Sequence, residues 1–220
     1  MDWSEFCAGI ARFGPAIFFT FVAAFYTARI LWLGSRRGAS PVAYGAPGTR
    51  PYRIYRTFRI FRLLIWTISV SRAIWPPFGS LALPIAMLTI PALMTVGNLL
   101  MAAAFVRVAW LNLSMGDQWR SGAPTPDDPG PLLTDGAFAR CRHPMLAAVM
   151  VGQVGLFLAI PSLFTLLCLL VGVWTLVEHV AVEERELASR HGERWAAYCA
   201  VTPKWPWSRR PVTRSNCVRA

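Results

Sequence analysis

Long apolar stretches alternate with shorter polar segments along this chain. The first covers residues 13–33, which is enough for a helix that crosses a bilayer with about 20 residues. A second covers about 59–75 and stops at two prolines. A third lies within 81–113, where we expect the helix to begin near Pro91. The Gly- and Pro-rich segment 34–57 predicts a loop without a long helix.

The C-terminal half predicts a helical hairpin followed by one more helix. Residues 145–160 and 162–182 are apolar and are separated by Pro161, so we expect the chain to turn there. From Glu183 to about Ala200 the pattern is typical of a charged amphipathic helix. We therefore predict an all-α fold: an integral membrane helical bundle with about five transmembrane helices plus a cytoplasmic C-terminal amphipathic helix.

Composition and charge support a membrane protein. The chain is 55% hydrophobic and only 15% charged, whereas soluble domains carry about 25% charged residues. Segments 34–62, 115–143 and 183–220 hold 7, 3 and 8 Lys or Arg residues, and only Arg12 and Arg72 fall on the opposite side. The positive-inside rule then places the N-terminus outside and the C-terminus in the cytoplasm, and we expect the bacterial inner membrane. The net charge of +11 thus indicates the lipid bilayer as partner, and no nucleic acid.

Arginine recurs at every third position from Arg50 to Arg62, and an aromatic residue stands directly before each of the last four. One interpretation is the interfacial start of a helix, with aromatic rings at headgroup depth and arginines near the phosphates. The other is a basic wall that guides an anionic substrate or the carboxylate of a cofactor. The first arrangement is the commoner one.

Two polar clusters stand at the ends of the predicted hairpin. Arg142, His143 and Pro144 open its first arm, where proline costs no hydrogen bond and a helix N-terminus attracts a carboxylate. Glu183 and Glu184 follow its second arm. Each cluster alone is typical of a helix start at a membrane surface, but a hairpin brings both to the same face. Together they suit a ligand that carries an ammonium, a carboxylate and a sulfonium.

Three segments carry a family pattern. Residues 133–144 (LTDGAFARCRHP), 183–204 (beginning EERELASRHG) and 115–122 (MGDQWRSG) are similar to the motifs LvTxGpYxxxRHP, EExxLxxxfGxxYxxYxxxvPr and MGxxWRxG. Over about residues 108–207 the chain resembles the isoprenylcysteine carboxyl methyltransferases and the related phospholipid methyltransferases. The resemblance implies an integral membrane methyltransferase that uses S-adenosylmethionine. It implies in-line SN2 transfer of the methyl group to a lipidic or small apolar acceptor, which is a carboxylate, an amine or a thiol.

The resemblance also implies the site. We expect Arg142, His143 and Glu184 to be catalytic. The residues expected to bind the cofactor, which include His179 one turn before Glu183, are His143, Pro144, Leu146, Ala148, His179, Glu183, Glu184 and Tyr198. Weaker candidates for the substrate side are Asn112, Trp119 and Arg120. Leu146 and Ala148 replace a Tyr and a Gly of the family pattern, and Gly152 and Gly155 are candidates for the close backbone approach that this glycine would allow.

We predict that the chain has two parts. Residues 1–113 form the N-terminal transmembrane helices, about three spans with a basic cytoplasmic loop, and 114–220 form the methyltransferase core. One alternative is a membrane reductase of the sterol-reductase type that uses NADPH, whose phosphate would bind Arg185, Arg190 and Arg194 near the pocket. The other is a non-catalytic membrane protein that retains the motif.

Cys141 lies between two arginines that would lower its thiol pKa, but sulfonium chemistry needs no covalent nucleophile. The cysteines contain no CxxC pair, so we expect no metal site.

Overall fold

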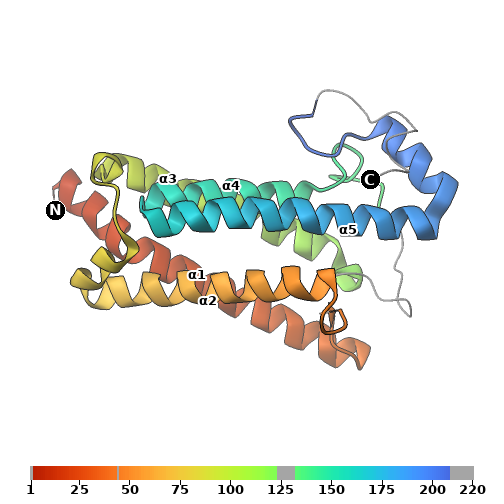
Figure 1. Ribbon diagram of the computed structural model, residues 1–220, viewed down its shortest axis with the longest axis horizontal. Coiled ribbons are helices and arrows are strands. Elements are labelled where there is room, and N and C mark those ends of the chain that lie inside the picture. Colours follow the sequence, from red (N-terminus) through yellow and green to blue (C-terminus); the bar gives the residue numbers. More distant parts are fainter. Residues whose placement is uncertain (1, 44, 123–131, 209–220) are drawn as a thin grey trace.

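The computed structural model describes residues 2–43, 45–122 and 132–208. Over these residues the chain forms a helical bundle, and the predicted all-α class is confirmed. In Figure 1, α3, α4 and α5 lie along one another on one side of the bundle, and α1 and α2 lie on the other. The α-helices are α1 (Trp3–Arg37), α2 (Arg50–Ile74), α3 (Pro91–Ser114), α4 (Pro144–Ala159) and α5 (Leu163–Val201). The short elements are η1 (Pro76–Ala82), η2 (Ala86–Leu88), η3 (Gly116–Gln118), β1 (Val42–Ala43) and β2 (Ser121–Gly122).

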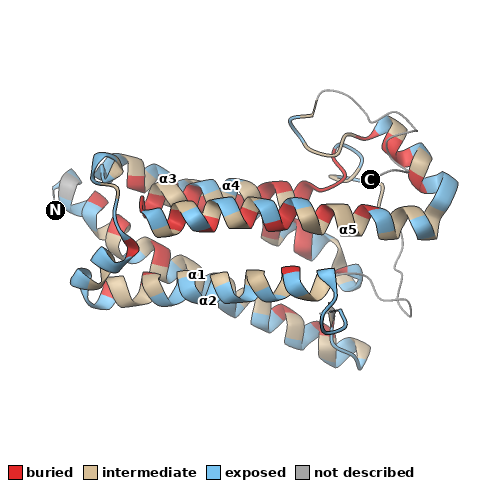
Figure 2. Cartoon of the chain, viewed as in Figure 1, coloured by how far each residue is buried: buried red, intermediate tan, exposed pale blue. Residues whose placement is uncertain are grey.

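Within the described residues, three helices are long and apolar enough to cross a membrane, namely those over Glu5–Arg37, Pro91–Ser114 and Leu163–Val201. Many of their large apolar residues are exposed, and Figure 2 shows exposed positions along the helices of the bundle. Leu99 of α3 is 65% exposed and Leu170 of α5 is 61% exposed. Such a surface is stable against lipid and costly in water. The protein is therefore an integral membrane protein.

The other two helices, α2 and α4, lie where spans were predicted. With 16 residues, α4 is a shorter apolar helix. Five arginines lie in the first thirteen residues of α2, and this helix is not among the three that meet the length and hydropathy requirements. The assignment of α2 and α4 as complete spans stays a prediction.

The closest helix pair is α3 with α4, and glycine makes it possible. A Cβ atom on Gly97 would lie 2.3 Å from the backbone nitrogen of Ala159, and one on Gly155 would lie 2.8 Å from the backbone nitrogen of Met101. Both distances are too short for any side chain, so the two backbones are in direct contact. Small residues at such contacts are the usual means of helix association in lipid. Gly155 therefore serves helix packing in this structure.

The start of α2 differs from the sequence prediction. The helix begins at Arg50 rather than near residue 59, so the prediction of a loop through residue 57 was wrong for residues 50–57. Thr49 is the N-cap, and its side chain accepts a hydrogen bond from the backbone N–H of Tyr52. Pro51 stands in the first turn, where its missing N–H costs nothing. The proline that suggested a loop thus opens the helix, and the arginine repeat lies on helical backbone.

The end of α5 also differs from the prediction. The amphipathic segment does not begin as a new helix at Glu183 but continues the second arm of the hairpin. The direction changes at Gly192, whose φ of 47° and ψ of −118° interrupt the helix. Glycine suits this position because a side chain would strain a backbone with positive φ. Beyond it, Trp195, Tyr198 and Cys199 form a small buried cluster. The kinked segment folds back over the end of the bundle, at the right of Figure 1.

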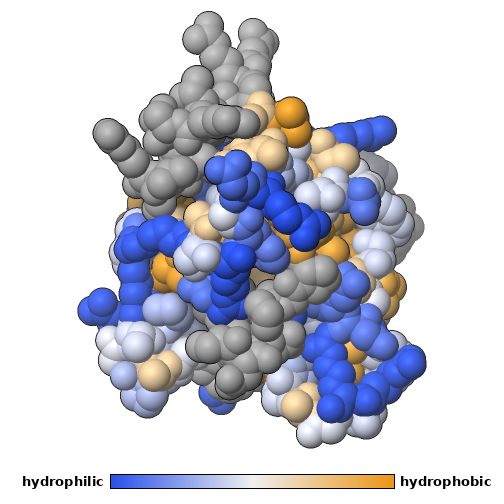
Figure 3. All heavy atoms as spheres, turned by 90° about the vertical axis from the view of Figure 1, so that its right-hand side faces the viewer, coloured by the Kyte–Doolittle hydropathy of each residue, from blue (hydrophilic) through white to orange (hydrophobic). Residues whose placement is uncertain are grey.

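Two short contacts organise the loops at this same end. Val42 of β1 pairs with Ser121 of β2, which ties the loop after α1 to the loop after α3. Buried Arg29 of α1 donates from Nε to Oδ1 of Asn112 at 2.9 Å and also reaches the carbonyl of Gly116. Figure 3 looks onto this end, where hydrophilic side chains surround patches of hydrophobic ones. Residues 123–131, which follow β2 in the sequence, lie outside the described residues.

Candidate active site

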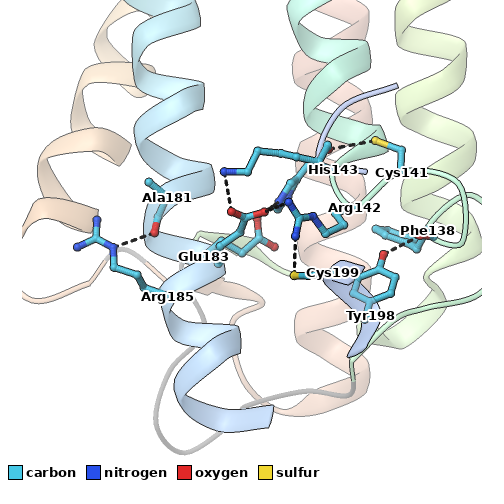
Figure 4. Close-up of polar contacts among 11 residues, drawn as sticks. Phe138, Cys141, Arg142, His143, Ala181, Glu183, Arg185, Tyr198 and Cys199 are labelled. Atoms are coloured by element: carbon cyan, nitrogen blue, oxygen red, sulfur yellow. Dashed lines mark hydrogen bonds and ion pairs between the residues drawn. The ribbon is translucent and has the colours of Figure 1, made fainter. Parts of the chain in front are cut away.

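Glu184 of α5 is the centre of a buried ion cluster. Its Oε1 lies 3.2 Å from Nη2 of Arg142 and 3.1 Å from Nε2 of His143, and its Oε2 lies 2.6 Å from Nζ of Lys204. The side chains of Arg142 and Glu184 are only 1% and 4% exposed. Figure 4 shows Arg142 and His143 turned toward the carboxylates of α5. Because buried charges are stable only when they are paired in good geometry, these contacts hold the start of α4 against α5.

His143 lies between both carboxylates. Its Nδ1 is 3.4 Å from Oε2 of Glu183, while its Nε2 faces Glu184. Burial disfavours the charged imidazolium, but hydrogen bonds to Glu183 and Glu184 and their negative charges outweigh burial, so the pKa of His143 is raised. An imidazole that donates from both nitrogens is positively charged. When His143 is protonated, the local set is three cations, Arg142, His143 and Lys204, against two carboxylates.

Glu183 and Glu184 are not equivalent. The Glu184 side chain contacts three cations and is almost fully buried. The Glu183 side chain is 35% exposed, and within the described chain its contact is the one with His143. Glu184 therefore organises the cluster, and Glu183 keeps an accessible carboxylate for a ligand.

The segment after α5 closes over the cluster. The backbone N–H of Arg142 donates to the carbonyl of Pro203 at 3.0 Å, and the thiol of Cys141 donates to the carbonyl of Lys204 at 3.3 Å. The ring of Trp205 lies 5.9 Å from that of His143. These contacts fix Lys204 beside Glu184. Burial raises the pKa of the Cys141 thiol, more than its neighbouring arginine lowers it, so the activation that Cys141's flanking residues suggested is absent.

A cavity of about 390 Å³ opens between the five α-helices, next to the cluster. Its volume is within the range of about 300–1,000 Å³ that is usual for small-molecule sites. Met145 and Leu146, directly after the His143–Pro144 pair, line its wall from α4, and His179, one turn before Glu183, lines it from α5. Most of the remaining wall is apolar or aromatic. The arrangement therefore joins a polar cluster that can hold charged groups to an apolar space that excludes water.

The predicted site residues separate into three groups in the structure. Arg142, His143, Glu183 and Glu184 form the cluster. The second group lines the cavity and comprises Leu146, Ala148, His179, Trp119 and Arg120. The third has structural contacts away from the cavity wall: Pro144 opens α4, Tyr198 donates to the carbonyl of Phe138 at 2.6 Å, and Asn112 accepts from Arg29. The roles of all these residues in binding or catalysis stay predictions.

Several residues of the site were missed in the sequence. Lys204, which contacts Glu184, stands in the family ending but was not among the predicted site residues. It is the only lysine in the chain, which is a signal that was available. Gln153 of α4 also lines the cavity and was missed. Arg62 of α2 belongs to the arginine repeat for which a basic wall was the second interpretation, and only the packing of α2 against α5 shows that this arginine lines the cavity.

Comparison with known proteins gives one family. Residues 92–194 match the family model described as phospholipid methyltransferase. Curated proteins and solved structures give no match. The matched range begins with α3, contains the hairpin with Arg142, His143, Glu183 and Glu184, and ends just after Gly192. It confirms the family resemblance drawn from the sequence. The segment that carries the site, residues 92–194, is thus similar to the phospholipid methyltransferases, a family of membrane methyltransferases.

Proposed function

We propose that this protein is an integral membrane methyltransferase that binds S-adenosylmethionine and methylates a lipidic or small apolar acceptor. The observation that carries the proposal is the juxtaposition of the Glu184 ion cluster with the apolar cavity, since Leu146 and His179 of the cavity wall are close neighbours of cluster residues in sequence. The cofactor carries charged groups, which the ion cluster can bind. The acceptor is apolar, and the apolar cavity can hold it.

The residues of the cluster fit the cofactor. Glu183 offers an accessible carboxylate for the amino group, and Lys204, whose side chain is 28% exposed, offers an ammonium for the carboxylate. Arg142 and His143 add positive charge close by. When bound, S-adenosylmethionine supplies a methyl group activated by a sulfonium. Leu146 and Ala148 leave this part of the wall apolar, so the cluster provides the charged contacts.

The residues of the chain position the reactants and exclude water. The aromatic and aliphatic wall of the cavity holds the acceptor by burying apolar surface. The buried pairs around Glu184 hold α4 and α5 in one geometry, and alignment of this kind is the main contribution a protein makes to a displacement reaction. The proposal includes the orientation predicted from the arginines, with the cluster at the cytoplasmic face of a bacterial inner membrane.

The proposal is tested by cofactor binding to the purified protein in neutral-lipid nanodiscs. Radiolabelled S-adenosylmethionine should bind the wild-type chain, and a Glu183→Gln variant should bind it at least about tenfold more weakly because a charge-assisted contact is lost. Glu183 is the variant of choice because it is partly exposed and its replacement leaves the pairs of Glu184 intact. A matched control is Glu178→Gln on the same helix, which removes a pair with Arg50 outside the cluster.

A thermal-shift measurement on the same purified protein distinguishes the two alternative functions. Thermal stabilisation by NADPH but not by S-adenosylhomocysteine would replace the proposal by the reductase. In the structure Arg190 is paired with Glu186 and Arg185 donates to its own helix, so two of the arginines proposed for the phosphate are already engaged. Absence of binding by both ligands would favour the non-catalytic protein.

A further inference from the structure

The polar groups of the cavity have one sign of charge. Two arginines, Arg62 of α2 and Arg120 after η3, line it together with His179. No aspartate or glutamate is among the described residues of its wall. The rest of the polar lining is neutral and comprises Tyr26, Tyr55, Thr57, Ser121, Gln153 and Thr175. A cavity with this lining attracts anions and repels cations.

Arg62 is the unusual member of this set. It lies twelve residues after Arg50, about 18 Å along α2 at 1.5 Å per residue, which is within the apolar part of the bundle. Its neighbours on the wall are Phe58, Phe61 and Ile65. The side chain is exposed, and Arg62 has no hydrogen bond or ion pair with the described residues. A cation among apolar side chains without a compensating charge is costly and usually serves function.

We propose that Arg62 is the specificity-determining residue of the acceptor cavity, and that it binds an anionic oxygen group, a carboxylate or a phosphate, on an apolar acceptor. The proposal rests on the proposed function and narrows its acceptor. Arg62 lies outside the segment 92–194 that matches the family, so the preference belongs to this chain's own N-terminal half. A lipid amine, protonated at neutral pH, is disfavoured by Arg62 and by the absence of acidic side chains on the described wall.

Binding of labelled lipids to the full chain in phosphatidylcholine nanodiscs tests this, with empty nanodiscs as background. Three probes are compared: oleate, phosphatidic acid and oleylamine. We expect at least one of the two anionic probes to bind the wild-type chain about tenfold or more tightly than oleylamine. In Arg62→Gln the affinity for that probe should fall about ten- to a hundredfold, which is the usual worth of a charge-assisted hydrogen bond in a poorly hydrated site. Arg62→Lys should keep part of the affinity.

Arg59→Gln is the matched control. Arg59 lies one turn earlier on the same helix, is exposed, and is not among the residues that line the cavity. Its replacement removes the same charge and should leave lipid binding unchanged. An equal loss in Arg59→Gln would mean that general surface charge attracts the probe, and it would overturn the assignment of Arg62. So would unchanged binding of the anionic probes by Arg62→Gln, or equally tight binding of oleylamine.

Cofactor binding separates this proposal from the proposed function. Each variant is also assayed for S-adenosylmethionine, for which Arg62→Gln should behave as the wild type because Arg62 lies outside the cluster. Loss of oleate or phosphatidate binding with intact cofactor binding supports Arg62 as the acceptor determinant. A wild-type chain that binds no cofactor but binds the anionic lipid through Arg62 contradicts the proposed function alone.

Discussion

The ion cluster and the cavity differ in whether their charged side chains are paired. In the cluster, Glu184 is enclosed by Arg142, His143 and Lys204, and every one of these charges lies within 3.2 Å of an opposite one. On the cavity wall, Arg62 has no such partner within the described chain. The cluster is thus stable without a ligand, whereas Arg62 gains its compensation from outside. The paired charges therefore hold the structure together, and the accessible ones, Glu183 and Arg62, are where we expect ligands to bind.

Replacing Glu184, the central carboxylate of the cluster, should have the largest effect on stability. Glu184→Gln leaves Arg142, His143 and Lys204 together without their central carboxylate, and breaking a buried ion pair in this way costs about 3–5 kcal/mol. The free energy of unfolding, measured by denaturant titration in mild detergent, should fall by that amount. Glu178→Gln, which removes a half-exposed pair with Arg50 on the same helix, should cost less than about 1 kcal/mol. Equal costs would show that Glu184 is no more than a surface acid.

Substitution of two glycines of α4 should affect stability differently, because one packs against α3 and the other lines the cavity. Gly155→Ala would place a Cβ 2.8 Å from a backbone nitrogen of α3, so the helices must separate, at a cost of about 1–3 kcal/mol. Gly152 lines the cavity, and a Cβ there meets only the Cβ of Ala104 at 3.4 Å. Gly152→Ala should therefore be neutral or stabilising by up to about 1 kcal/mol. Thermal unfolding of both variants measures this, and the reverse order would mean that α3 and α4 pack differently.

The stability should depend on pH through His143, which precedes α4. Its pKa is raised in the folded protein above the value of about 6.5 in an unfolded chain. The resulting stabilisation is fully present below pH 6.5 and is lost as the pH rises through the folded pKa. The melting temperature should therefore decrease over that range, and His143→Gln should remove this component of the decrease. A His143→Gln profile identical to that of the wild type would show that the imidazolium contributes nothing.

Cys141, at the edge of the cluster, should have the smallest effect. The residue is 4% exposed and burial raises its thiol pKa, so the reactive thiolate is scarce at neutral pH. Cys141→Ser keeps a donor for the carbonyl of Lys204 and should change cofactor binding less than about twofold. Iodoacetamide at neutral pH should leave Cys141 unmodified in the native protein, as peptide mass spectrometry would show. Rapid modification would place Cys141 in an accessible, activated site.

Particular elements show what could be predicted along the chain. The starts of α3 at Pro91 and of α4 at Pro144 followed from proline at the first turn, and the hairpin followed from Pro161 between two apolar runs. The start of α2 was misjudged because Pro51 was taken as part of a loop rather than as a first-turn residue. The boundary at Glu183 was misjudged because polarity changes there, whereas the backbone turns only at Gly192.

The sequence by itself determined the membrane class, the helices and the pairing of Arg142 and His143 with two glutamates, since these depend on local apolar length, proline positions and one short hairpin. Only the tertiary structure decided which glutamate is enclosed, that Lys204 completes the cluster, and that Arg62 faces the same cavity as His179. The reason is physical. Local patterns specify backbone and burial within one element, but the partner of a charge depends on the packing of helices that are distant in the chain, here α2, α4 and α5.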